Sequence, residues 1–274
     1  MTAALLDRPT ADITRREVIL GGLSLAALTA AGCGDDGPSE DAAITATRDV
    51  RDVFGPITVP RDPRRVVALD DQVLGNLLRL GFPQERIVGW ARNDTPLERY
   101  GYLAEWGDLA AIPDIGGAFD DPNIEAIVAA DPDLLMMVAE AGVDFYTPIF
   151  DKLRETGIPV FGAFNGYLSV DQYMQLLRDV GVAVGLESKA KELEDDYRAR
   201  VADLSTRLEA SGPLPTATFV RVIPGDGMIF NNLMPILDAV GVPGDRPGPE
   251  EFYRELSAEQ IEQLDHDVLF VGDG

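Results

Sequence analysis

The sequence predicts an α/β protein with two lobes, each built on a parallel sheet, and one long helix that joins them. From Ile57 onwards, short apolar runs alternate with helix-like stretches, which is typical of strands connected by crossover helices. A charged helical stretch of about six turns, residues 186–208, separates two such alternations. A segment that begins at Glu125 aligns without a gap to one that begins at Glu259, so the second half repeats a unit of the first.

The first lobe is expected within residues 57–168. Its predicted strands are residues 65–69, 87–91, 133–138 and 158–161. Its predicted helices are residues 72–80, 97–106, 123–130 and 144–156. The helix after the first strand has a stripe of Val and Leu side chains that stops at Gly81, as expected of a helix with one face on a core.

The connecting helices are expected within residues 169–211, and the second lobe within residues 212–274. The connecting region contains helical stretches at residues 169–184 and 186–208. In the second lobe the predicted strands are residues 217–223 and 268–271, and the predicted helices are residues 231–240 and 258–264.

Charge and composition exclude several classes of protein. The 274 residues include 47 acidic and 23 basic side chains, and a net charge of −24 would repel phosphate backbones, so no nucleic-acid partner is expected. Cys33 is the only cysteine and His266 the only histidine. Disulfides within the chain and metal sites with several Cys or His ligands are therefore excluded, and His266, in a turn beside an acid, is expected at the surface.

Residues 1–33 have the pattern of an export signal. Arg15 and Arg16 precede the uncharged run Val18–Gly32, which is shorter than the roughly 20 apolar residues that a spanning helix needs. The run therefore fits the core of a twin-arginine signal peptide. Its end, Leu-Thr-Ala-Ala-Gly before Cys33, resembles a bacterial lipobox, although Ala30 stands where that motif prefers Leu. This resemblance implies that Cys33 is lipidated; the alternative is a plain secretory signal with an incidental cysteine.

A flexible tether is expected at residues 34–56. This stretch is small, acidic and poor in aromatic residues, which is the composition of a solvated linker between a membrane anchor and a folded domain.

The internal repeat places a glutamate in the first turn of a helix in each lobe. Glu125 follows the candidate N-cap Asn123, and Glu259 follows the candidate N-cap Ser257. An acidic residue at this position is favoured by the helix dipole by about 0.3–1 kcal/mol, so each glutamate alone has a structural explanation. Their equivalent placement also fits a second interpretation, in which the two glutamates bind a symmetric partner.

Several motifs together resemble the ferric-siderophore and cobalamin class of ABC-transporter substrate-binding lipoproteins. They include Ile-Thr-Val-Pro at 57–60, Pro-Arg-Arg-Val-Val-Ala-Leu at 63–69, Ile-Gly-Gly at 115–117, Pro-Asn-Ile-Glu-Ala-Ile at 122–127, Asp-Pro-Asp-Leu-Leu at 131–135 and Leu-Ser-Ala-Glu-Gln-Ile at 256–261. The resemblance covers about residues 57–274. It implies two Rossmann-like lobes joined by the long helix, a ligand cleft between them and little hinge motion. Members of this class continue with further βα units, so the second lobe is expected to be incomplete; the alternative is a second lobe that is naturally minimal.

The resemblance also implies a function. An extracytoplasmic lipoprotein, held by a lipid anchor on the outer face of the cell membrane, would capture a ferric siderophore and deliver it to an ABC permease. The permease would contact one glutamate on each lobe, here Glu125 and Glu259. No cofactor is expected beyond the iron chelate as ligand, and a monomer is expected. The alternatives are a cobalamin or haem-type binding protein of the same fold, or a surface lipoprotein without a transport role if truncation has destroyed the cleft.

Candidate ligand-binding residues follow the predicted strands, because open α/β sheets bind ligands at the carboxyl ends of their strands. The guanidinium groups of Arg92 and Arg221 suit the carboxylate or catecholate oxygens of an anionic iron chelate. Four aromatic residues are placed to pack on the chelator: Trp90, Phe164, Tyr167 and Phe230. For each aromatic residue, packing in the core is an equal alternative. A free-metal binder needs several His and carboxylate ligands, which a single histidine does not supply.

An enzyme is the second class of function to weigh. Asp70 and Asp71 follow the first predicted strand, a position compatible with phosphoryl transfer. The sequence contains neither a glycine-rich phosphate loop before a helix nor a Gly-x-Ser-x-Gly elbow, and no suitable base is nearby. The pair fits a helix N-cap better, so the sequence predicts no catalytic residues and no enzyme.

Overall fold

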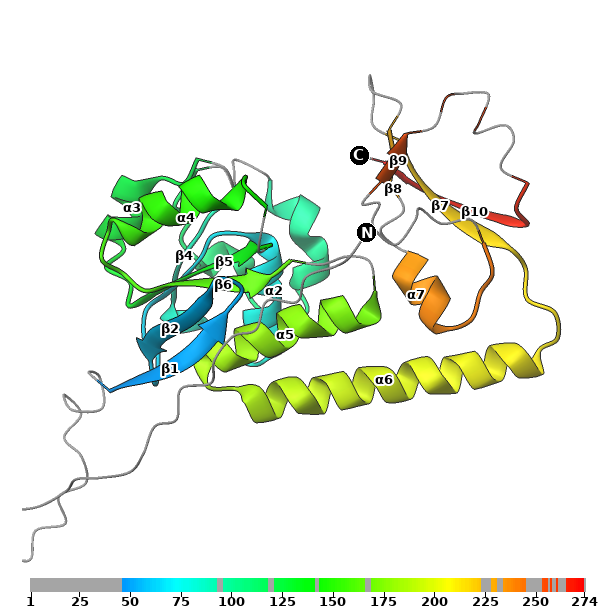
Figure 1. Ribbon diagram of the computed structural model, residues 1–274, viewed down its shortest axis with the longest axis horizontal. Helices are drawn as coiled ribbons and strands as arrows, with labels where there is room; N and C mark the ends of the chain where they lie inside the picture. Colours follow the sequence, from blue (N-terminus) through cyan, green and yellow to red (C-terminus); the bar gives the residue numbers. More distant parts are fainter. Residues whose placement is uncertain are drawn as a thin grey trace, which may run out of the picture. The chain divides into compact units, whose positions relative to one another are not determined.

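The computed structural model describes most of the chain from Ala46 onwards (Figure 1). The described residues are 46–92, 96–117, 121–140, 143–165, 169–222, 228–230, 234–244, 253–255, 257, 260 and 265–273. The predicted signal peptide, including Cys33, lies outside this part. Within it, no helix combines the length and the apolar character needed to cross a bilayer.

The described chain begins with an antiparallel hairpin of β1 (Thr47–Asp52) and β2 (Gly55–Pro60). Asp52 holds the turn: Oδ1 accepts hydrogen bonds from the backbone N–H groups of Phe54 and Gly55, at 2.8 and 3.0 Å. Its Oδ2 accepts from the N–H of Gly162 at 3.1 Å, which fixes the hairpin to a strand of the main sheet. The predicted tether, residues 34–56, is therefore wrong for residues 47–56, which belong to a folded hairpin.

Four parallel strands form the main sheet in the order β4-β3-β5-β6. They are β3 (Val66–Ala68), β4 (Ile87–Trp90), β5 (Leu134–Ala139) and β6 (Val160–Phe164). The four strands predicted for the first lobe are confirmed. The chain passes from β3 outwards to β4 and then returns to the other side of β3, so the direction of strand addition reverses between β3 and β5.

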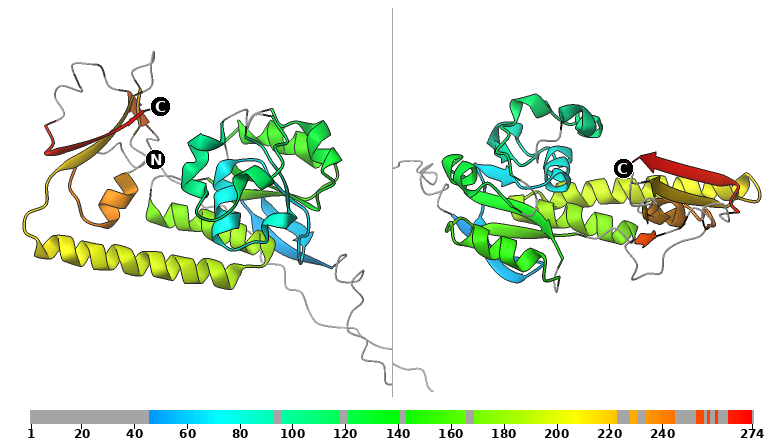
Figure 2. Two further views of the ribbon diagram at one scale, coloured as in Figure 1. Left: turned by 180° about the vertical axis from the view of Figure 1, so that it is seen from behind. Right: turned by 90° about the horizontal axis from the view of Figure 1, so that it is seen from above.

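Helices cover both faces of this sheet (Figures 1 and 2). They are α2 (Asp71–Arg79) and α5 (Val170–Val184) on one face, and α3 (Ile124–Ala129) and α4 (Tyr146–Arg154) on the other. Every residue of β5 is buried: Leu134, Met136 and Val138 pack in one core cluster and the alternate residues in the other. This explains why β5 reads as a continuous apolar run, as expected of a strand covered on both faces.

One short 3₁₀ helix precedes β4 and two follow it. They are η1 (Gln84–Arg86), η2 (Leu97–Leu103) and η3 (Leu109–Ala111). The helix predicted at residues 97–106 is thus a 3₁₀ segment with a kink at Tyr100, where φ and ψ leave the helical region.

The long helix α6 (Glu187–Ala210) follows α5 after a sharp turn. Gly185 ends α5 with a φ of +77°, a left-handed conformation that favours glycine. Close packing also requires Gly181, because a Cβ at that position would lie 2.8 Å from the Cβ of Ala190 in α6. The helix predicted at residues 186–208 is confirmed, and its charged composition fits its mostly exposed surface.

The second half contains a parallel pair, β7 (Ala217–Val222) with β10 (Val268–Asp273), and the helix α7 (Met234–Ala239). An antiparallel pair, β8 (Met228–Phe230) with β9 (Tyr253–Glu255), was not predicted, because runs of three residues are too short to leave a pattern. Of the helix predicted at residues 258–264, the structure describes only Gln260. Parallel strand pairing in both halves, with helices between, confirms the α/β class.

Candidate functional site

The carboxyl ends of β3, β4, β5 and β6 meet at one edge of the main sheet, next to the point where strand order reverses. Ligands of open α/β sheets bind outside this edge. Each segment that leaves it has a polar or charged residue within two positions of the end of the strand, namely Asp70, Arg92, Glu140 and Asn165. We call this region the carboxyl edge.

Asp70 is a structural residue of the carboxyl edge. It is the N-cap of α2, and its Oδ1 accepts a hydrogen bond from the backbone N–H of Val73 at 2.7 Å. Its Oδ2 accepts from the backbone N–H of Val138 in β5 at 2.8 Å. Burial raises the pKa of Asp70 to about 7, although the two backbone hydrogen bonds oppose this shift. The N-cap predicted for the Asp pair is confirmed at Asp70.

Asp71 holds an aromatic residue that the sequence did not single out. The hydroxyl of Tyr102 donates a hydrogen bond to Asp71 Oδ2 at 2.6 Å, and 56% of Tyr102 is exposed. Partial burial and this hydrogen bond to a carboxylate raise the pKa of Tyr102, so the phenol stays protonated. Phe145, at the N-cap of α4 after β5, is a second exposed aromatic residue, with 50% of its surface accessible. Both residues lay inside predicted helices, where they gave no signal of a site.

Trp90 does not face the ligand side of the edge. It has no exposed surface, belongs to the core, and packs edge-on against Tyr100 with ring centroids 4.7 Å apart. The prediction that Trp90 contacts the ligand is therefore corrected: the core-packing alternative describes this residue. Its indole nitrogen is buried without a hydrogen-bond partner.

Arg92 lies just beyond β4 with its charge already paired. Its Nη2 is 2.6 Å from Asp114 Oδ2, and the two side chains are 20% and 28% exposed. The other carboxylate oxygen of Asp114 accepts a hydrogen bond from the N–H of Gly116 at 2.9 Å, which fixes the acid in place. Arg92 is thus at the predicted edge, held by a carboxylate that sequence spacing did not reveal.

Phe164 and Asn165 end β6 at the same edge. Phe164 is half-buried, and its backbone N–H donates to Asp179 Oδ2 in α5 at 2.8 Å. The amide nitrogen of Asn165 donates to the hydroxyl of Tyr146, at the start of α4, at 2.8 Å. The amide oxygen of Asn165 is buried and has no hydrogen-bond partner. The structure therefore places Phe164 and Arg92 at one edge and adds Asn165 to them.

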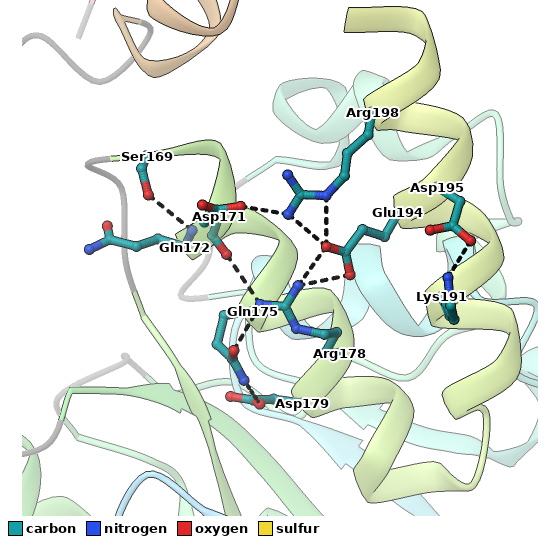
Figure 3. Close-up of polar contacts among 10 residues, drawn as sticks. All are labelled: Ser169, Asp171, Gln172, Gln175, Arg178, Asp179, Lys191, Glu194, Asp195 and Arg198. Atoms are coloured by element: carbon teal, nitrogen blue, oxygen red, sulfur yellow. Dashed lines mark hydrogen bonds and ion pairs between the residues drawn. The ribbon is translucent and has the colours of Figure 1, made fainter. Parts of the chain in front are cut away.

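A network of charged residues fixes the start of α5, just after the β6 loop, to α6 (Figure 3). Arg178 Nη1 lies 2.7 and 2.8 Å from the two carboxylate oxygens of Glu194. Arg198 Nη2 contacts Glu194 Oε1 at 2.7 Å and Asp171 Oδ1 at 2.5 Å. Ser169 caps α5 by accepting from the N–H of residue 172. One glutamate thus links two arginines across the two helices.

The remaining predicted residues are placed as follows. Glu125 is exposed in the first turn of α3, whose N-cap Asn123 accepts from the N–H of Ala126 at 3.1 Å. Arg221 lies on β7 and Phe230 on β8, but their side chains are outside the described part. Three residues, Tyr167, Glu259 and Cys33, lie outside the described residues altogether. Across the described part, no group of three or more His, Cys, Asp or Glu side chains is arranged to hold a metal ion.

Comparisons with known proteins agree on one family. Residues 66–274 match the sequence profile of the periplasmic binding protein family. The Fe(3+)-citrate-binding protein YfmC of Bacillus subtilis is 23% identical over 265 residues, which cover 92% of this chain and 78% of YfmC. A cobalamin-binding protein of Halobacterium salinarum is 25% identical over 221 residues, 79% of this chain and 56% of that protein.

Solved structures show the same fold. The petrobactin-binding protein YclQ of Bacillus subtilis has a TM-score of 0.66 at 19% identity, and the similarity covers 84% of this chain and 78% of YclQ. The parallel sheet and its polar carboxyl edge agree with the profile match, which covers most of the sequence. This chain therefore belongs to the periplasmic binding protein family.

Proposed function

We propose that this protein is an extracytoplasmic solute-binding lipoprotein that captures a ferric siderophore and delivers it to an ABC permease. Membership of the periplasmic binding protein family carries the proposal. The names of YfmC and YclQ, which bind ferric citrate and petrobactin, favour an iron chelate as ligand. The protein would act by binding and delivery alone, without catalysis.

In this proposal the carboxyl edge forms the first-lobe side of the ligand site. Arg92 and Phe164 remain candidate ligand contacts, because both lie at the carboxyl edge, at the ends of β4 and β6, with part of their surface accessible. Tyr102 and Phe145 take the place of Trp90, since their exposed rings are able to pack on the methylenes and rings of a chelator. The sequence-based candidates Tyr167, Arg221 and Phe230 complete the proposed site.

The proposal includes docking and anchoring. Glu125 is exposed at the start of a short helix, a position that a basic residue of a permease is able to reach. Glu259 is its counterpart in the sequence repeat. A lipid on Cys33, after export through a twin-arginine signal, would keep the protein at the outer face of the membrane.

Calorimetric titration against a panel of ligands tests the proposed function. The panel contains ferric citrate, a ferric tricatecholate, a ferric trihydroxamate, cobalamin and haem. A ferric chelate should bind and stabilise the protein by about 2.7 kcal/mol at a ligand concentration of 100 Kd, without turnover. Binding of cobalamin alone would instead support the alternative suggested by the Halobacterium salinarum relative, and binding of none would contradict the proposal.

A further inference from the structure

The carboxyl edge lacks an available positive charge in its described part. Arg92 is the basic residue placed there, and its guanidinium lies 2.6 Å from the Asp114 carboxylate. The Gly116 hydrogen bond holds Asp114 in position, so the pair is built into the fold. A polyanionic ligand that approaches Arg92 would meet the carboxylate as well and would gain little from the arginine.

The chain that leaves the four strands is otherwise acidic. Among the described residues of the segments that leave these strands, Arg92 is the single basic residue, and Asp71, Glu140 and Asp144 are acidic in addition to the buried Asp70. Asp71 accepts a hydrogen bond from Tyr102, and the side chain of Glu140 is exposed. Exposed carboxylates therefore outnumber the one positive charge among these residues, which is already paired, and they would repel an anionic ligand.

Asn165 supplies an independent observation. Asn165 is 7% exposed, and its amide oxygen has no hydrogen-bond partner. Its amide nitrogen donates a hydrogen bond to the hydroxyl of Tyr146. A buried acceptor without a partner is unfavourable, and native proteins rarely leave one unpaired. A ligand that brings an N–H or O–H donor to this position would remove the penalty.

We propose that the ligand is a neutral or cationic ferric chelate with N–H or O–H donors on its periphery, as in a ferric trihydroxamate, rather than a polyanionic carboxylate or catecholate complex. This inference rests on the proposed function and narrows its ligand class. It also differs from the sequence-based expectation of an anionic chelate, because Arg92, one of the two arginines on which that expectation depended, is compensated by Asp114.

A matched ligand series tests the charge preference. Ferrioxamine B has a free terminal amine and is cationic; its N-acetyl derivative is neutral, and its N-succinyl derivative is anionic. The three share one iron-binding trihydroxamate. In calorimetric titrations at low ionic strength, affinity should fall by about threefold to tenfold for each step towards negative charge. Equal affinities, or tightest binding of the succinyl derivative, would overturn the inference.

The outcomes separate the inference from the proposed function. If ferric citrate or a ferric tricatecholate binds and none of the three trihydroxamates does, the proposed function stands and the inference is wrong. If no ferric chelate binds at all, the proposed function fails, and the inference fails with it.

Variants test the residues named in the inference. Asp114→Asn keeps an acceptor for the Gly116 N–H and releases the Arg92 charge, so the succinyl derivative should gain about threefold to tenfold relative to ferrioxamine B. Asp203→Asn makes the same change in net charge on the exposed surface of α6 and should leave the ratio unaltered. An unchanged ratio in Asp114→Asn would contradict the role of the pair.

Asn165→Leu tests the buried acceptor. This variant should weaken binding of all three trihydroxamates by about threefold to tenfold, the range of a single hydrogen bond. Tyr146→Phe is the control, because it removes the hydrogen bond between these two side chains and keeps the Asn165 amide. If Tyr146→Phe weakens binding as much as Asn165→Leu, the amide oxygen does not contact the ligand, and this part of the inference is wrong.

Discussion

The carboxyl group of Asp70 joins the start of α2 to Val138 in β5, since its two oxygens accept backbone hydrogen bonds from both elements. This buried link lies directly beneath the carboxyl edge. Burial raises the pKa of Asp70 to about 7, from a usual value of 3.8. Between these values the folded protein holds the proton and the unfolded chain does not. The free energy of unfolding should therefore fall as the pH rises, by about 1.4 kcal/mol per pH unit.

Asp70→Asn should reduce this pH dependence. The variant does not ionise, but its amide nitrogen must face a backbone N–H, so it should be less stable than the wild type at every pH. Urea denaturation at pH 4.5 and pH 7.5 measures both effects. Some dependence of the same sign should remain, because burial also raises the pKa of Asp179. A variant with the full wild-type pH dependence would show that Asp70 does not hold the proton.

Glu194→Gln should loosen the attachment of α5 to α6. Burial alone would raise the pKa of Glu194, but the hydrogen bonds from Arg178 and Arg198 outweigh it and hold the pKa below its ordinary value. The Glu194 side chain is 13% exposed, so loss of its charge should reduce the free energy of unfolding by about 1–3 kcal/mol. Asp195→Asn removes an exposed pair with Lys191 on the same helix and should change it by less than about 0.5 kcal/mol. Equal effects of the two variants would contradict a structural role for the network.

The sequence predicted elements whose signal is local and missed those that depend on distant partners. β5 and α6 have continuous apolar or charged patterns and were found. The β1–β2 hairpin was missed because β1 carries several charged residues, and because Asp52 stabilises the hairpin through Gly162, more than a hundred residues away. The site followed the same rule. The position of Arg92 at the carboxyl edge was predictable. Its pairing with Asp114 depends on a contact between separate segments, which the sequence spacing does not reveal.

Cys33→Ser should release the protein from the membrane fraction. The described part of the chain has no helix fit to cross a bilayer, and a net charge of −24 opposes attraction to anionic lipids. Fractionation of cells followed by immunoblotting measures the change, with Asp203→Asn as a surface variant that should stay membrane-bound. Sedimentation of Cys33→Ser with membranes would indicate a different anchor.

The double variant Glu125→Ala, Glu259→Ala should bind its chelate normally and fail to support uptake. Glu125 is exposed in the first turn of α3 and is not among the residues that directly follow the four strands, so ligand affinity should not change. Contacts at an exposed rim act through steering and register, so uptake should fall most at low ionic strength, where charges interact over about 30 Å instead of 8 Å. Transport by vesicles reconstituted with the permease, compared with calorimetric affinity, makes the distinction.

Glu209→Ala, which removes an exposed glutamate at the end of α6, is the control for this double variant and should transport normally. If the double variant also transports normally, the two glutamates act only on the dipoles of their own helices. If it loses chelate binding as well, the substitutions have damaged the lobes, because loss of a docking residue should reduce transport and leave ligand affinity unchanged.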